Sequence, residues 1–504
     1  MNKTEDIANK AIRGTNWNVI NVYSKTIISF FVGIILARVL LPEDFGLFGM
    51  TLVFTGFADL FATMGMSMAV VRLKEITDNH LRVAFTLTLI LSIVIYLTFF
   101  LLSPAIASFY GEVELVEIIR TVSLLFLFKG VSSIGYGLLV KEINFKYLFK
   151  SEISSFVFGY TLFAVTLALL GFGVWSLVIG KLVGSTITLI FLTLKVKVFY
   201  RPLISKKEFS ELFNFGTGFS LSKILFYLSS NVSNLLIGKF LSSASLGLYT
   251  KSFNLMTLPI NQLSSVLYNV VFPTFAKVQD DIGKLRNGYL RIIRTITFLL
   301  FPILAGAYFC AEYLVLGLYG ENWVGAIEPL KLLCIAGLFK ITLSYSGSLA
   351  HASGRVYSEA FRQFINLIII IVGVLIGVNY GLFGVCIAII VSNVWLFIAH
   401  SNLAINILKI NWYVFLKNLV PSIVNAFIIS VLNYITISFI EQSIDEFSVI
   451  IKLIIMAAVN VIAFILLIFF LPKSIKGDTV SWMSQKYIKA FPKMPNIIKN
   501  LLPQ

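Results

Sequence analysis

The chain has 504 residues, of which 58% are apolar and only 13% charged, with a mean hydropathy of +0.91. Soluble globular domains carry roughly 25% charged residues, so the composition excludes an ordinary water-soluble protein and predicts an all-α protein in a bilayer. Lys and Arg exceed Asp and Glu by 16. In a membrane protein, the placement of these charges matters more than their number.

Fourteen apolar stretches, separated by charge clusters and Gly or Pro turns, approach the roughly 20 residues that a membrane-spanning helix needs. These predicted spans 1 to 14 lie near residues 15–37, 46–70, 83–108, 116–139, 153–171, 174–194, 212–238, 246–272, 295–318, 328–350, 363–379, 382–408, 418–440 and 453–471. Cys310, Cys334 and Cys386 each fall in an apolar run, and we interpret them as small core residues rather than metal ligands or disulfide partners.

The basic residues support this division, because they alternate between the two sides of the membrane. With the N-terminus inside, 29 of the 40 Lys and Arg fall in segments predicted to be cytoplasmic and only five in the opposite loops. Cytoplasmic loops are enriched in Lys and Arg, so we expect both termini to be cytoplasmic. The loops on the other side are short, which excludes a large extracytoplasmic domain.

The two halves of the chain share short motifs at a nearly constant offset. Arg38 and the Gly-Leu-aromatic run at 46–48 recur 201 residues later as Lys239 and the run at 247–249. Gly173-Val174-Trp175 is echoed by the triplet at 381–383. The repeat predicts two six-helix lobes related by an axis along the membrane normal, as in parallel-repeat transporters.

The expected domains follow from this repeat. They are an N-lobe at 1–197, a linker at 198–211, a C-lobe at 212–408, two appended helices at 409–472 and a basic tail at 473–504. The tail contains six lysines, and Trp482 and Phe491 are among its aromatic residues. It fits a segment that lies on the anionic inner leaflet, and equally a solvated basic tail.

Six lysines fall inside predicted spans rather than in loops: Lys25, Lys129, Lys181, Lys223, Lys251 and Lys340. Asp59 is the only acid that this division places inside a span, so the predicted interior carries a net charge of +5. A charge at a helix centre costs about 2.5–3.5 kcal/mol even by lower estimates, so such residues usually face a bundle interior or a water-filled cavity. We interpret Lys129 and Lys340 as side chains that snorkel to the interface.

Polar side chains recur every three or four residues in spans 1, 2, 7 and 8, which places them along one stripe of each helix. The stripes are Asn18, Asn21, Lys25 and Ser29; Thr51, Thr55, Asp59 and Thr63; Ser220, Lys223, Tyr227, Asn231 and Asn234; and Lys251, Asn254, Gln262, Ser265 and Asn269. Such stripes can hold helices together through side-chain hydrogen bonds. Because three of them contain a lysine and the helices correspond under the repeat, we favour a shared aqueous cavity.

A cavity with a net positive charge predicts an anionic cargo, and phosphate is the obvious candidate. The candidate substrate-binding residues are Lys25, Lys223, Lys251, Lys181, Asn21, Tyr227, Asn231, Asn254 and Gln262. Asp59 is a candidate for taking up a coupling proton or sodium ion, and its alternative is an ion pair with a cavity lysine. We expect no catalytic residue, metal or cofactor, since the sequence shows no nucleophile triad, metal-ligand cluster or phosphate loop.

The segment Leu36-Ala37-Arg38-Val39-Leu40-Leu41-Pro42-Glu43-Asp44-Phe45-Gly46-Leu47-Phe48 resembles a signature of bacterial polysaccharide exporters in the oligosaccharidyl-lipid flippase superfamily. The Gly-Phe-Gly-Val-Trp run at 171–175 resembles the same family. The similarity covers essentially the whole chain, and it is strongest to the branch that exports lipopolysaccharide O-units, colanic acid or teichuronic acid.

This resemblance implies two six-helix lobes around a central cationic cavity, lined by spans 1, 2, 7 and 8. It further implies a flippase that turns an undecaprenyl-pyrophosphate-linked oligosaccharide from the inner to the outer leaflet of the bacterial plasma membrane by alternating access. A proton or sodium counter-ion and a polysaccharide polymerase with its export machinery are the expected partners, and no nucleic acid is expected.

Two other classes of function compete with a flippase. A multidrug antiporter of the related toxin-extrusion type also has two six-helix lobes, but such exporters favour cationic drugs and use intramembrane acids, opposite to the charge predicted here. A membrane-bound oligosaccharide polymerase or ligase would need catalytic groups at the outer face. The predicted outer loops are short and contain no histidine, since His80, His351 and His400 fall at or near the cytoplasmic side.

Overall fold

The computed structural model describes residues 3–62, 66–73, 76–196, 201–278, 281–443 and 447–470, and these residues form helices and connecting segments without a strand. The chain divides into two compact units, Met1–Gly247 and Leu248–Gln504. The all-α prediction is confirmed for the described residues.

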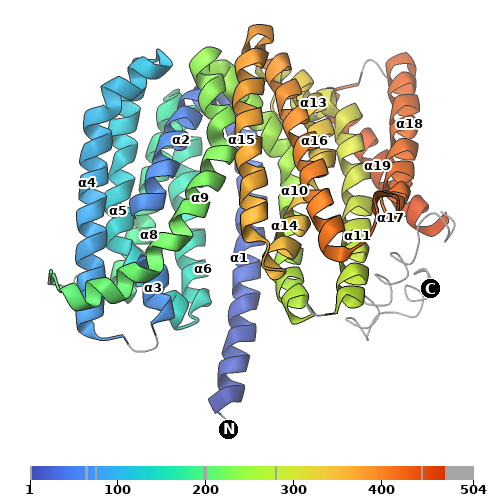
Figure 1. Cartoon of the computed structure of the whole chain (residues 1–504). Helices are drawn as coiled ribbons and strands as arrows, with labels where there is room; N and C mark the ends of the chain where they lie inside the picture. Colours follow the sequence, from blue (N-terminus) through green and yellow to red (C-terminus); the bar gives the residue numbers. More distant parts are fainter. Residues whose placement is uncertain are drawn as a thin grey trace. The chain divides into compact units, whose positions relative to one another are not determined.

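The first unit is built from long helices that pack in pairs. Its elements are α1 (Lys3–Val39), α2 (Pro42–Ala62), α3 (Met66–Arg72), α4 (Asp78–Tyr110), α5 (Leu115–Lys141), α6 (Phe145–Ser154), the π-helix η1 (Ser155–Phe163), α7 (Ala164–Leu169), α8 (Val174–Lys195), α9 (Lys206–Phe240) and the first residues of α10 (Ser243–Lys277). Helix α5 packs between α4 and α8, as Figure 1 shows, while α1 packs against α6 and α2 against α9.

The second unit contains the rest of α10 and the helices that follow it. They are α11 (Ile282–Phe309), α12 (Ala311–Leu318), the 3-10 helix η2 (Glu321–Ala326), α13 (Ile327–Lys340), α14 (Leu343–Ala352), α15 (Val356–Gly377), the 3-10 turn η3 (Val378–Tyr380), α16 (Gly381–Leu408), α17 (Trp412–Lys417), α18 (Val420–Ser443) and α19 (Val449–Phe470). Helix α16 packs against α13 and α15, and α11 packs against α18.

Each of the fourteen predicted spans overlaps one or more helices, and the described residues contain nine helical stretches long and apolar enough to cross a membrane. One of these stretches is the continuous run Val356–Leu408, which contains predicted spans 11 and 12. The chain is a multi-pass membrane protein. The count of fourteen crossings and the predicted domain boundaries remain predictions.

Local sequence signals explain where several helices begin and end. Thr77 caps the start of α4 by accepting a hydrogen bond from the His80 backbone N–H, and the His80 ring accepts one from the Thr77 N–H in return. The same helix ends at Gly111, whose φ of +79° is a left-handed conformation that glycine adopts without a steric penalty. At the start of α2, the Asp44 carboxylate accepts a hydrogen bond of 2.9 Å from the Leu41 N–H.

The internal repeat appears as a reciprocal backbone contact between the starts of α2 and α10. A Cβ on Gly46 would overlap the carbonyl oxygen of Ser243, and a Cβ on Gly247 would overlap the carbonyl oxygen of Pro42. Pro42 corresponds to Ser243, and Gly46 to Gly247, at the offset of 201 residues that the motifs predict. The contact therefore maps onto itself under the repeat, and only glycine permits the two backbones to approach so closely.

Within the second unit, helix α18 contacts its neighbours through polar side chains as well as apolar ones. On α18, Ser422 shares a hydrogen bond of 2.8 Å with Thr297 of α11, and the Asn433 amide exchanges two hydrogen bonds with Asn460 of α19. Buried amides of this kind join helices within a bilayer. Cys310, Cys334 and Cys386 are all buried free thiols, as expected for small core residues.

Replacing Gly46 with Ala should destabilise the protein by about 1–3 kcal/mol, because the new methyl group overpacks the contact with Ser243. Gly49→Ala is the matched control, since a Cβ there meets the Leu246 side chain at an ordinary 3.6 Å. Thermal unfolding of the two purified variants provides the measurement. Equal melting temperatures for both variants would contradict the tight crossing.

Candidate functional site

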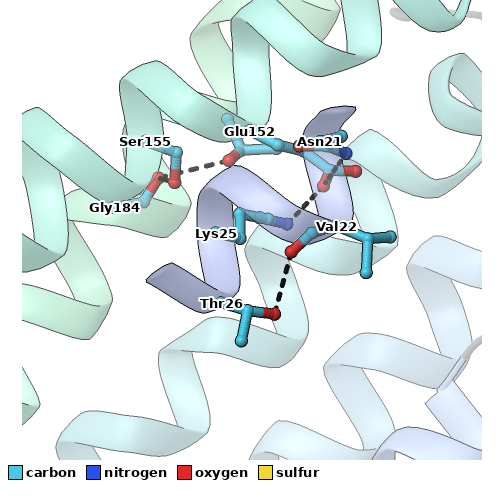
Figure 2. Close-up of polar contacts among 8 residues, drawn as sticks. Asn21, Val22, Lys25, Thr26, Glu152, Ser155 and Gly184 are labelled. Carbon is cyan, nitrogen blue, oxygen red and sulfur yellow. Dashed lines mark hydrogen bonds and ion pairs between the residues drawn. The ribbon is translucent and has the colours of Figure 1, made fainter. Parts of the chain in front are cut away.

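The predicted polar stripe of α1 meets an acid that the sequence analysis had assigned to a cytoplasmic segment. Lys25 forms an ion pair with Glu152 of α6, and the Asn21 amide donates a hydrogen bond of 3.0 Å to the same carboxylate oxygen, Oε2. Figure 2 shows both α1 side chains directed at Glu152. The helical stretch Phe145–Leu169, which is long and apolar enough to cross a membrane, contains this acid.

Helix spacing brings these three residues together. Trp17, Asn21 and Lys25 are four residues apart and share one face of α1. On α6, the Phe149 ring packs against that of Trp17 at a tilt of 41°, with ring centroids 5.2 Å apart, and Glu152 lies three residues further along. The aromatic contact thus sets the register in which Glu152 reaches Lys25. The other two members of the predicted stripe, Asn18 and Ser29, are exposed.

The backbone changes its winding immediately after Glu152. Helix α6 ends at Ser154, and the next nine residues, Ser155–Phe163, form the π-helix η1. The Ser155 hydroxyl donates a hydrogen bond of 2.6 Å to the Gly184 carbonyl on α8, and a Cβ on Gly159 would overlap the Gly184 backbone. π-Helical turns are rare and are found frequently at functional sites.

Two predicted residues of α9 also lie in the first unit. Tyr227 donates a hydrogen bond of 2.8 Å to the Val53 carbonyl of α2, and its ring lies where a side chain on Gly56 would be. The half-buried Asn231 donates a hydrogen bond of 3.0 Å to the Tyr227 carbonyl, within its own helix. The hydroxyl of Tyr227 therefore fastens α9 to α2, a role that the stripe pattern alone did not indicate.

Lys251 of α10 lies among aromatic rings in the second unit. Its Nζ is 5.2 Å from the ring centroid of Tyr319 and 5.7 Å from that of Trp323, and only 8% of the residue is exposed. Trp323 itself is fully buried. An ammonium over such ring faces is attracted by their negative potential, so the aromatic residues partly replace water around a cation that the helix carries into the core.

For three other predicted site residues, the structure gives the exposure of the side chain. Lys181 is exposed on α8, Asn254 is exposed on α10 and Gln262 is half-buried on the same helix. The side chains of Lys223 and Asp59 lie outside the described part of the structure. Among the described residues, no group of three or more His, Cys, Asp or Glu side chains is arranged to hold a metal ion.

Sequence reasoning missed Glu152, Tyr319 and Trp323. Glu152 directly precedes the predicted span 153–171, and its segment contains several lysines, so it resembled a loop. The sequence does contain a signal for this helix: no Gly or Pro interrupts residues 145–158. The helix can therefore begin before the apolar run. No comparable local signal connects Lys251 with Trp323, which is 72 positions away.

The chain belongs to the family described as "Polysaccharide biosynthesis protein", whose pattern it matches over residues 35–328. It is 30% identical to the lipopolysaccharide biosynthesis protein WzxC of Escherichia coli K12, over 72% of this chain and 75% of WzxC.

Two solved structures share the fold. The lipid II flippase MurJ, in an inward closed conformation, superimposes with a TM-score of 0.71 at 15% identity, covering 89% of this chain and 96% of MurJ. An inward-facing multidrug resistance MATE transporter superimposes with a TM-score of 0.62 at 19% identity, covering 76% of this chain and 95% of the transporter.

Replacing Lys251 with Met should lower stability by about 0.5–2 kcal/mol, because Met keeps an unbranched stem but loses the attraction of the ammonium to the two rings. Lys417→Met, at an exposed position on α17 of the same unit, is the control and should have no measurable effect. Chemical unfolding of the purified variants measures the difference. Unchanged stability of the Lys251 variant would show that the rings do not hold the cation.

Proposed function

We propose that this protein flips a lipid-linked oligosaccharide, carried on undecaprenyl pyrophosphate, from the inner to the outer leaflet of the bacterial plasma membrane. The observation that carries the proposal is the pair of donors on α1: the Lys25 ammonium and the Asn21 amide converge on one anionic oxygen. A phosphate oxygen of the cargo has the same chemistry as that carboxylate oxygen.

The family and the fold support this assignment independently of the site residues. WzxC is described as a lipopolysaccharide biosynthesis protein and MurJ as a lipid II flippase, so a relative acts in polysaccharide assembly and a protein of the same fold moves a lipid-linked precursor. The fold alone does not distinguish a flippase from a multidrug transporter, because the MATE transporter shares it. The charges of the site make that distinction.

The sign of the charge in the spanning helices favours an anionic cargo over a cationic drug. Helices α8 and α10 carry lysines and no acidic residue. On α1, Lys25 is paired with Glu152 of α6. This acid neutralises one cation and does not make the site negative. A cation antiporter would need uncompensated acids in these positions.

In the proposed cycle, the pyrophosphate meets Lys25, Lys223 and Lys251, with Asn21, Tyr227, Asn231, Asn254, Gln262 and Lys181 as further contacts to the head group and sugar. The prenyl chain stays in the lipid while two lobes, 1–197 and 212–408, rock about the site. Asp59 is the candidate for proton or sodium coupling. Cytoplasmic termini and association with a polysaccharide polymerase and its export machinery complete the proposal.

Removing the three principal cations should abolish export while leaving the protein in the membrane. The variant combines Lys25→Ala, Lys223→Ala and Lys251→Met, the last chosen to preserve packing. Bacterial strains that each lack one polysaccharide exporter are complemented with the wild type, and the surface polysaccharide that returns identifies the cargo. The variant is then tested in the strain that responds, with its membrane level measured by immunoblot.

A second triple variant controls for the loss of positive charge. Lys206, Lys409 and Lys417 are exposed and lie outside the spanning stretches, and replacing all three with Ala should leave export near the wild-type level. Full export by the Lys25, Lys223 and Lys251 variant would remove the charge argument. Failure of the wild type to restore any polysaccharide, together with increased resistance to cationic dyes, would favour a cation antiporter.

A further inference from the structure

The carboxylate of Glu152 occupies the position that an anionic cargo would need. Its Oε2 accepts both the Lys25 ammonium and the Asn21 amide, so the two donors of α1 that are nearest to this oxygen already have an anionic partner. Cargo that binds Lys25 through a phosphate oxygen must therefore compete with Glu152.

The pair is accessible enough for such an exchange. The Lys25 side chain is 37% exposed and that of Glu152 is 21% exposed, so an incoming anion can reach the ammonium without the helices separating. A fully buried pair would resist this, because removing one partner leaves an uncompensated charge in a low-dielectric interior. Here the incoming phosphate replaces one negative oxygen with another.

The backbone after Glu152 is a π-helix that is held firmly against α8. Glu152 lies three residues before η1. If a residue of η1 changes from π-helical to α-helical winding, the segment before it rotates about the helix axis. The contact of Gly159 with Gly184 and the hydrogen bond from Ser155 to Gly184 hold η1 against α8. Helix α6 is held to the same helix, because the Tyr147 hydroxyl donates a hydrogen bond of 2.8 Å to the Phe191 carbonyl of α8. A change of the Glu152 side-chain rotamer is therefore the movement that would release Lys25.

We propose that Glu152 is an internal counter-anion, which holds Lys25 when the site is empty and is displaced when the pyrophosphate of the cargo binds. This inference rests on the proposed function. Glu152 is a positioning residue in this scheme: it keeps Lys25 oriented, and it speeds release by returning to the ammonium. Its negative charge also sets a threshold, because only an anion that binds Lys25 more strongly than one carboxylate displaces it.

Displacement can be measured in the wild-type protein by carbodiimide cross-linking. The reagent joins the Glu152 carboxyl to the Lys25 amine as an amide and takes up the water that is lost, and mass spectrometry quantifies the linked peptides. We expect saturating undecaprenyl pyrophosphate to reduce this product at least about fivefold. The exposed pair of Asp281 and Lys284, with 3.0 Å between Oδ2 and Nζ, is the internal control and should be cross-linked equally with and without the lipid.

Binding measurements with variants separate the inference from the proposed function. Glu152→Gln should bind undecaprenyl pyrophosphate about tenfold more tightly than the wild type, which corresponds to about 1.4 kcal/mol, because the competing charge is gone. Glu142→Gln removes the same charge from an exposed position at the end of α5 and should change the affinity less than twofold. Lys25→Ala should bind more weakly than all of these.

The outcomes are distinct. If the wild type binds the lipid and Lys25→Ala weakens binding, but the Lys25–Glu152 cross-link is unaffected by the lipid, the counter-anion role is wrong and the flippase proposal stands. If the wild type does not bind undecaprenyl pyrophosphate, both are wrong. Should Glu152→Gln fail to fold, the cross-linking result in the wild type decides the question without it.

Discussion

A charge inside a bilayer persists only where another group compensates its lost hydration, and this constraint governs the arrangement around the intramembrane lysines. Lys25 is compensated by Glu152 and lies beside the Asn21 amide. Lys251 is compensated in part by the ring faces of Tyr319 and Trp323. A carboxylate paired with an ammonium can be replaced by another anion, whereas neutral ring faces that attract an ammonium are fixed parts of the core. The two lysines are thus suited to different tasks, although their sequence contexts look alike.

The surrounding helices make the exchangeable pair possible. Phe149 packs against Trp17 and thereby fixes the register of α6 on α1, and η1 follows with its glycine contact to α8. Also in the first unit, the Tyr227 hydroxyl links α9 to α2 by a hydrogen bond, and the reciprocal contact of Gly46 and Gly247 joins the starts of α2 and α10. Close helix contacts in the first unit therefore accompany one polar pair that is partly exposed.

Much of this fold could be predicted from the sequence, because hydrophobic length and loop charge are direct consequences of the bilayer. Every predicted span overlaps at least one helix, and the offset of 201 residues reappears as the contact between Gly46 and Ser243. The site was harder, because periodicity shows which face of a helix is polar but not what it meets. Asn21 and Lys25 were predicted as cavity-lining residues, and the structure places them against Glu152. The aromatic rings around Lys251 come from residues that only the tertiary fold brings near.

The central claim is that fixed intramembrane cations select an anionic, lipid-linked cargo, and a flipping assay with matched cargoes tests it most directly. The purified protein is reconstituted in vesicles with a fluorescent sugar carried on a short polyprenyl pyrophosphate, or with the same sugar joined to the same polyprenyl chain by a neutral ether. A membrane-impermeant quencher reports the fraction in each leaflet. We expect transbilayer movement of the pyrophosphate-linked sugar only, and its inhibition by excess undecaprenyl pyrophosphate. Equal movement of the neutral compound would contradict the claim.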